Sequence, residues 1–261
     1  MPTLHLLGTG ASVSDAHRTT TMLAVSDANA ASSIAVDCGA DLVQRLLSAG
    51  LSLDTLDALV ATHAHPDHVS GFPLFMEKIW LAGRDRPIPV CGIAHALAQT
   101  RRSWDAFAPV HAGWDVPPID WQTIPHESGA VLWDDAPWHV TASPVDHGDM
   151  PNIGLRVKHR PSGGVVAYSC DTAPCDAVVD LAHEADVLVH EANGTGGGHS
   201  SAEEAAEVAR AAGAKRLLLV HLPPGDKSDA LDAARAVFRN TDLGKEEGAY
   251  AFGEAKATAE T

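Results

Sequence analysis

Four of the six residues in His63-Ala64-His65-Pro66-Asp67-His68 carry side chains that can bind a transition metal. This segment directly follows an apolar, strand-like run at residues 59–62. A strand that delivers two imidazoles, then a carboxylate and a third imidazole, has the ligand types that a two-metal hydrolytic centre needs. Because Asp67 and His68 are neighbours, one turn can direct some ligands to one metal ion and the rest to a second.

Matching side chains recur later in the chain at the ends of strand-like runs. Five such runs end in a potential ligand or catalytic group: His63, His147, Asp171, His190 and His221. A packed sheet presents its strand ends together, so these residues are predicted to converge on one cleft although they are far apart in the sequence.

The elements that position these residues alternate between strands and helices. Strands are predicted near residues 22–25, 33–36, 56–62, 138–142, 165–169, 186–189 and 216–220, and helices near 42–47, 74–80, 200–212 and 229–238. Residues 84–135 are irregular, with a strand at 90–93 and a helix from residue 94 to 107. The stretch from Trp114 to Trp138 could cover one side of the site. This alternation favours layered α/β packing over a barrel or an all-β sandwich.

The chain has 261 residues, of which 45% are hydrophobic, enough for a sizeable core. We expect a single domain over 1–261, built of two α/β halves at about 1–136 and 137–261. Its tail from about residue 242 should be poorly defined, apart from a short strand near 249–252. No apolar run approaches the roughly 20 residues of a membrane helix, and the N-terminal segment does not resemble a signal peptide. These features predict a cytoplasmic protein without membrane association.

Acidic residues number 34 against 18 Lys and Arg, which gives a net charge of −16. Such a charge disfavours a broad nucleic-acid-binding surface but is compatible with a small phosphodiester held mainly by metal ions. The four cysteines form no Cys-x-x-Cys pair and are predicted to be buried fillers rather than disulfides. Cys170, beside Asp171, could also be a ligand.

The segment Thr62–His68 resembles the signature of the metallo-β-lactamase superfamily. Asp146-His147-Gly148, Tyr168-Ser169-Cys170-Asp171-Thr172 and Val220-His221 follow in the order found in that family. The resemblance covers nearly the whole chain. It implies a four-layer αβ/βα sandwich with two divalent metal ions at one edge of two facing sheets.

The resemblance also implies a ligand set. One metal would be held by His63, His65 and His147, the other by Asp67, His68 and His221, with Asp171 bridging the two. An imidazole-rich set with a shared carboxylate suits Zn²⁺, although Mn²⁺ or iron would also fit. In such a centre a metal-bound hydroxide is the nucleophile, so no protein nucleophile is needed.

Two further segments, His190-Glu191-Ala192 and Gly198-His199-Ser200, are similar to those of the ribonuclease Z-like phosphodiesterase branch. By that likeness Glu191 orients His199, and His199 assists the leaving group. Together with Asp67 these are the predicted catalytic residues. Ribonuclease Z usually carries a tRNA-gripping arm between the segments of His147 and Asp171, but residues 148–170 leave room for little more than a hairpin.

The resulting prediction is a dinuclear-metal-dependent phosphodiesterase that acts on a small phosphodiester or cyclic nucleotide. A lactonase or thioesterase on the same centre is the alternative. A tRNA 3′-processing endonuclease and a non-enzymatic metal-dependent sensor are less favoured. The likeness also suggests a homodimer. Asp37 could support a ligand histidine, and His17 or Arg18 could approach a substrate.

Overall fold

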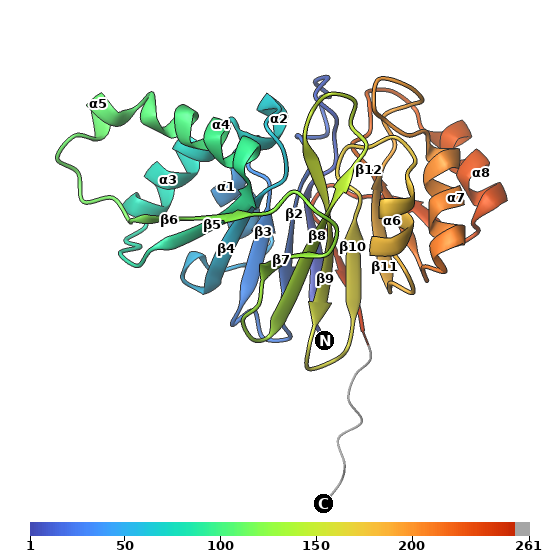
Figure 1. Ribbon diagram of the computed structural model, residues 1–261, viewed down its shortest axis with the longest axis horizontal. Helices are drawn as coiled ribbons and strands as arrows, with labels where there is room; N and C mark the ends of the chain where they lie inside the picture. Colours follow the sequence, from blue (N-terminus) through green and yellow to red (C-terminus); the bar gives the residue numbers. More distant parts are fainter. Residues whose placement is uncertain (254–261) are drawn as a thin grey trace, which may run out of the picture.

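The computed structural model describes residues 1–253, without the side chains of residues 109 and 111. Two seven-stranded sheets face each other, and helices cover the outer face of each (Figure 1). This confirms the predicted four-layer α/β sandwich.

The first sheet takes its strands from the start of the chain and one from its end. In spatial order they are β14 (Gly248–Ala251), β1 (Thr3–Gly8), β2 (Met22–Ser26), β3 (Ser33–Val36), β4 (Leu56–Ala61), β5 (Ile88–Ile93) and β6 (Ile119–Ile124). Strands β3 to β6 run parallel. The main helices on this side are α1 (Leu42–Ser48), α3 (Phe72–Leu81) and α4 (Ala94–Asp105); η1 (Leu53–Thr55), α2 (Pro66–Val69) and α5 (Ala108–His111) are short.

The second sheet is built from the following part of the chain. In spatial order its strands are β13 (Thr241–Leu243), β12 (Leu217–Val220), β11 (Val187–Glu191), β10 (Val165–Tyr168), β9 (Asn152–His159), β8 (Trp138–Val145) and β7 (Ala130–Trp133). Its outer face carries α6 (Asp176–Leu181), α7 (Ala202–Ala212) and α8 (Ser228–Val237).

Helix α7 shows why this sequence forms the outer layer. Ser201 and Glu204 make a reciprocal capping box at its start, and Gly213 ends it with a left-handed φ of 66°. The face turned to the sheet carries small side chains, among them Ala205, Ala206 and Ala209, all fully buried. Small residues let the helix pack close to the strands. It connects β11 to β12, and because these two strands pair in parallel, their C-terminal ends lie at the same edge of the sheet.

Two strands bear on the expected division into halves and on the tail, where a short strand was expected near residues 249–252. Strand β7 precedes residue 136 but belongs to the second sheet, because it pairs with β8. Strand β14 lies in the tail yet completes the first sheet, because β1 supplies its hydrogen-bonding partner. Together with β13, it gives the tail a defined structure up to Gly253, and the remaining residues lie outside the described part of the chain.

The irregular region between residues 84 and 135 forms β5, α4 and the edge strands β6 and β7. The predicted strand and helix near its start are therefore confirmed. The stretch from Trp114 to Trp138 extends both sheets rather than forming a separate cover. Among residues 1–253, none of the helices is both long and apolar enough to cross a membrane.

A buried arginine holds the segment between η1 and β5 together. Arg84 is only 4% exposed, and its guanidinium donates to the carbonyl oxygens of Leu53 (2.7 Å), Leu56 (3.1 Å) and Pro87 (3.1 Å). We expect Arg84→Met to lower the free energy of unfolding by about 3 kcal/mol, because buried carbonyls would lose charged donors. Urea unfolding checks this, with the exposed Arg102→Met as a control that should cost less than about 0.5 kcal/mol. Equal losses for the two variants would contradict the assigned role.

Candidate metal centre

The predicted ligands reach the centre from the ends of strands in both sheets. After β4 the chain delivers His63 and His65, and Pro66 then occupies the first turn of α2, where a missing N–H costs nothing. Asp67 and His68 follow within α2. From the second sheet come His147 after β8, Asp171 after β10 and His221 after β12.

A first group of four side chains can hold one metal ion. His63, His65, His147 and Asp171 each offer a ligand atom, and these atoms all lie within 4.8 Å of one another. Nδ1 of His65 lies 3.1 Å from Nε2 of His63 and 3.2 Å from Nε2 of His147. Burial lowers the pKa of His63 well below its usual value and also lowers that of His65. Both imidazoles therefore favour the neutral form that binds a metal.

A second group shares the same carboxylate. Asp67, His68, Asp171 and His221 also offer ligand atoms within 4.8 Å of one another. The Asp171 oxygens lie 3.4 Å from Nε2 of His68 and 3.3 Å from Nδ1 of His221. Asp171 belongs to both groups, so its carboxylate lies where a bridge between two ions would be needed.

Unpartnered polar atoms test whether the site fits a metal. Nε2 of His68, Oδ1 of Asp171 and Nδ1 of His221 are buried, and none makes a hydrogen bond within the described part of the chain. Buried polar atoms are normally satisfied, and three buried nitrogen and oxygen atoms without hydrogen bonds around one point fit the coordination of a cation.

The charge balance of this group points the same way. Although burial opposes ionisation, His221 and His68 hold the pKa of Asp171 well below its usual value. Although burial again opposes it, Asp171 and Asp37 raise the pKa of His68 well above its usual value. The pocket thus stabilises positive charge next to Asp171, which a divalent ion would also provide.

Hydrogen bonds from outside the two groups orient the candidate ligands. Nδ1 of His68 donates to Asp37 at 2.8 Å, and Asp37 also accepts from the Thr62 backbone at 3.0 Å. Nδ1 of His147 donates to the carbonyl oxygen of Gly198 at 2.8 Å. Gly198 has a φ of 82°, and a Cβ there would lie 2.9–3.0 Å from His147 atoms, so a larger residue would displace this candidate ligand.

Removing the charge of Asp37 should weaken metal binding. In Asp37→Asn the fully buried His68 loses the carboxylate that fixes its ring, and such partners typically contribute 10- to 100-fold in metal affinity. We expect a loss of about tenfold or more in a chelator-competition titration. Asp41→Asn is the matched control, since Asp41 bonds the backbone of Gln44 and the side chain of Lys78. Unchanged affinity in Asp37→Asn would contradict the role given to this carboxylate.

A carboxylate–histidine pair lies beside the two groups. Glu191 is fully buried, and its Oε1 accepts from Nδ1 of His199 at 2.8 Å and from the Thr172 backbone at 2.9 Å. This bond to Glu191 raises the pKa of His199. The His199 ring stacks on His221 with centroids 5.6 Å apart. It is therefore a positioned imidazole that holds a proton more firmly than a free one.

His199 and the ligand groups open into one small cavity. The cavity has a volume of about 230 Å³ and is lined by Ser12, His65, Pro66, Asp67, Asp171, His199 and His221. Sequence reasoning missed Ser12. The signal available was the Gly8-Thr9-Gly10 turn, because Gly10 forms a bridge with Leu222, the residue after His221.

The remaining candidates lie outside these two four-residue groups. His190 is fully buried, bonds the Glu191 carbonyl and belongs to neither ligand group. Cys170 lies 3.6 Å from Nδ1 of His63 and forms a third possible group with His63 and His68. Burial raises the pKa of its thiol, which disfavours the thiolate that would bind a metal. His17 and Arg18 line a different pocket.

The fold and this site define a class of protein, and comparison with known sequences agrees. Residues 33–222 match the family model described as Beta-lactamase superfamily domain. The chain therefore belongs to the β-lactamase superfamily. Within it, the chain is a ribonuclease Z-like metal-dependent hydrolase, as the sequence resemblance predicted.

That narrower assignment depends on a sequence relative. A ribonuclease Z from Mycobacterium sp. (strain KMS) is 31% identical over 269 residues, which cover 92% of each chain. Two solved structures share the fold. Human tRNase Z, short form (ELAC1), has a TM-score of 0.78 at 22% identity and covers 97% of this chain and 100% of its own. A diphosphatase from the PhnP family has a TM-score of 0.72 at 20% identity, with 97% and 98% covered.

Proposed function

We propose that this protein hydrolyses small phosphodiesters, using two divalent metal ions held by the two ligand groups. The observation that carries the proposal is His199, held by the buried Glu191, on the wall of the cavity that Asp67, Asp171 and His221 also line. A metal site alone would suit several hydrolytic reactions. A proton donor set beside it is what a phosphodiester with a poor leaving group requires.

The ligand roles follow from the two groups. His63, His65 and His147 would hold one ion, and Asp67, His68 and His221 the other, with Asp171 between them. Zn²⁺ is the ion that an imidazole-rich set favours, and Mn²⁺ and iron are alternatives. Such ions, when bound, lower the pKa of a water molecule and polarise a phosphoryl oxygen.

The protein's own residues supply the remaining chemistry. Nδ1 of His199 is occupied by Glu191, so Nε2 is the nitrogen available to give a proton to the leaving oxygen. The carboxylate of Glu191 accepts hydrogen bonds from the backbone N–H groups of Thr172 and Asn193. These bonds fix its position, and with it the position of His199. The burial of Asp171, at 2% exposure, keeps bulk water from competing for its oxygens.

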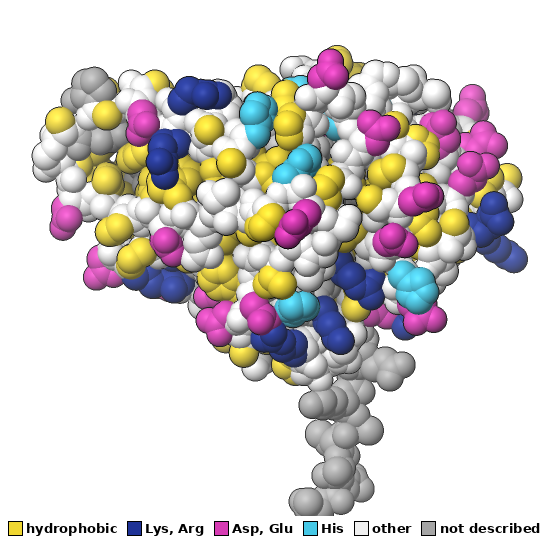
Figure 2. Space-filling model, viewed as in Figure 1, with side chains coloured by type: hydrophobic (Ala, Val, Ile, Leu, Met, Phe, Trp, Pro, Cys, Tyr) yellow, Lys and Arg dark blue, Asp and Glu magenta, His cyan; other side chains and the backbone are white. Residues whose placement is uncertain are grey.

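Three features support a small substrate rather than tRNA. The cavity of about 230 Å³ holds only a small group. Strands β9 and β10 fill the chain between His147 and Asp171, and their short connection at residues 160–164 leaves no long arm. On the face shown in Figure 2, basic side chains lie in separate small groups among acidic ones, consistent with the net charge of −16.

The relatives named ribonuclease Z favour a second candidate, cleavage of tRNA precursors. One substrate panel separates the two. The protein is loaded with Zn²⁺ or Mn²⁺ and assayed on bis(p-nitrophenyl) phosphate, a cyclic nucleotide, a tRNA precursor, a lactone and a thioester, with Asp67→Ala as the blank. We expect turnover of the small phosphodiesters only. Cleavage of the precursor alone would overturn the substrate class, and turnover of the esters alone would overturn the reaction.

A further inference from the structure

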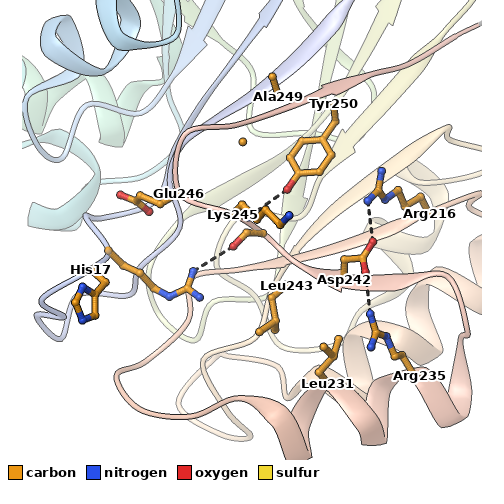
Figure 3. A pocket seen from close by; sticks show the side chains of 13 residues that line it. His17, Arg216, Leu231, Arg235, Asp242, Leu243, Lys245, Glu246, Ala249 and Tyr250 are labelled. Atoms are coloured by element: carbon orange, nitrogen blue, oxygen red, sulfur yellow. Dashed lines mark hydrogen bonds and ion pairs between the residues drawn. The ribbon is translucent and has the colours of Figure 1, made fainter.

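A second and larger pocket lies where the edge strands β13 and β14 approach helix α8 (Figure 3). Its volume is about 780 Å³, within the usual range for small-molecule sites. It shares none of its lining residues with the metal cavity. The proposed hydrolysis makes no use of it.

The lining is basic, although the protein as a whole is acidic. The pocket contains Arg18, Arg216, Arg235 and Lys245, four of the 18 Lys and Arg in a chain of net charge −16. Positive charge concentrated in one concave surface of an acidic protein attracts anions.

The two carboxylates of the lining do not cancel this charge. Asp242 lies between Arg216 and Arg235 and accepts from both, at 2.7 and 2.8 Å (Figure 3), so this trio keeps one net positive charge. Glu246 accepts from the backbone N–H groups of Thr9 and Thr19 at 3.0 and 2.9 Å.

Glu246 faces a cation outside the pocket, and Lys245 has no carboxylate beside it within residues 1–253. Glu246 lies 3.6 Å from Arg45, a cation outside the pocket. Lys245 is exposed, and within residues 1–253 no carboxylate lies within ion-pair distance of its ammonium group. The net charge of the lining is therefore positive.

The guanidinium groups are held in place yet remain accessible. Nε of Arg235 donates to the Thr241 carbonyl at 2.8 Å, and the Arg216 guanidinium lies 5.0 Å over the Tyr250 ring. Their side chains are still 44% and 37% exposed. A guanidinium has five N–H donors in a planar fork, so donors remain for a bound group.

We propose that this pocket binds a small molecule that carries a diphosphate group, such as a nucleoside diphosphate, independently of the metal centre. Guanidinium groups fixed by protein contacts suit the tetrahedral oxygens of phosphate, and Lys245 adds a mobile point charge. Leu231, Leu243 and Tyr250 provide apolar surface for the rest of the ligand. A single inorganic ion would leave most of this volume unfilled.

Isothermal titration of the full-length protein with ADP and with pyrophosphate tests the proposal, in buffer with and without EDTA. We expect saturable binding that survives EDTA and weakens as NaCl is raised. Lys245→Gln and Arg235→Gln should each weaken binding about fivefold, the effect of losing one exposed charge contact. Lys158→Gln, which removes an exposed lysine of β9 outside the pocket, should leave binding unchanged.

The two ligands separate the sources of affinity. Equal affinities for ADP and pyrophosphate would assign the recognition to the diphosphate alone. If ADP binds more tightly than pyrophosphate and Tyr250→Leu removes that difference, the pocket also contacts the base. The proposal is overturned if neither ligand binds saturably. It is equally overturned if binding disappears with EDTA and is unaffected in both pocket variants, because the phosphates would then occupy only the metal centre. Hydrolysis plays no part in either readout.

Discussion

Replacing Asp171 by asparagine should abolish nearly all hydrolysis and reduce the amount of metal that the protein holds. Asp171 is the one side chain common to both four-residue ligand groups, and it is 2% exposed. Asparagine keeps the shape but lacks the negative charge that offsets two cations. Metal ions contribute several kcal/mol of transition-state stabilisation, so kcat/KM should fall by about 10³-fold or more.

The measurement pairs elemental analysis of the purified protein with kcat/KM on bis(p-nitrophenyl) phosphate. Asp180→Asn, an exposed carboxylate of α6, makes the same chemical change outside the cavity and should leave both quantities unchanged. The bridging role is refuted if Asp171→Asn still binds two metal ions per chain and keeps the kcat/KM of the unchanged protein.

The layered fold could be predicted because its signals are local. Apolar runs that end in a ligand, such as residues 59–62 before His63, define both a strand and the edge at which it stops. The sheet to which β7 and β14 belong could not be predicted. β14 pairs with β1, so that Thr3 lies opposite Ala251, and the pattern of either segment alone does not identify so distant a partner.

The sequence predicts the positions of the ligand candidates better than it predicts the role of His190. The ligand candidates stand in a compact motif and at strand ends, and the structure places all seven in the two groups; that they bind metal stays a prediction. His190 shows the limit of the strand-end argument. Successive side chains of a strand point to opposite faces, so Glu191 reaches His199 while His190 is buried away from it.

Contacts that support the site were harder to foresee. The sequence indicates Asp37 only as a possible partner of a histidine, because nothing in it links residue 37 to residue 68. The basic pocket was not predicted at all. Its residues come from the loop after β1, from the residue before β12, from α8 and from both edge strands with the segment between them. No local pattern indicates that they meet.

Replacing His199 by alanine should reduce activity to an extent that depends on the leaving group. For a diester with an alkyl or nucleoside leaving group, loss of the proton donor should lower kcat/KM by about 10²- to 10⁴-fold. For p-nitrophenolate, which leaves readily without a proton, the loss should be much smaller. Metal content should be unchanged, because His199 belongs to neither ligand group. His183→Ala, at an exposed histidine, is the matched control.

Glu191→Gln separates the charge of the pair from its geometry. Glutamine can still accept the hydrogen bond from Nδ1 of His199, but it cannot stabilise the imidazolium as a carboxylate does. Its effect should therefore follow the same leaving-group order as His199→Ala and be smaller in size. Equal losses of His199→Ala on both kinds of substrate would show that this histidine positions the substrate or the metal site. If His199 donates a proton, its loss must lower kcat/KM more for a poor leaving group than for p-nitrophenolate. Only the poor leaving group depends on the proton that His199 holds beside Glu191.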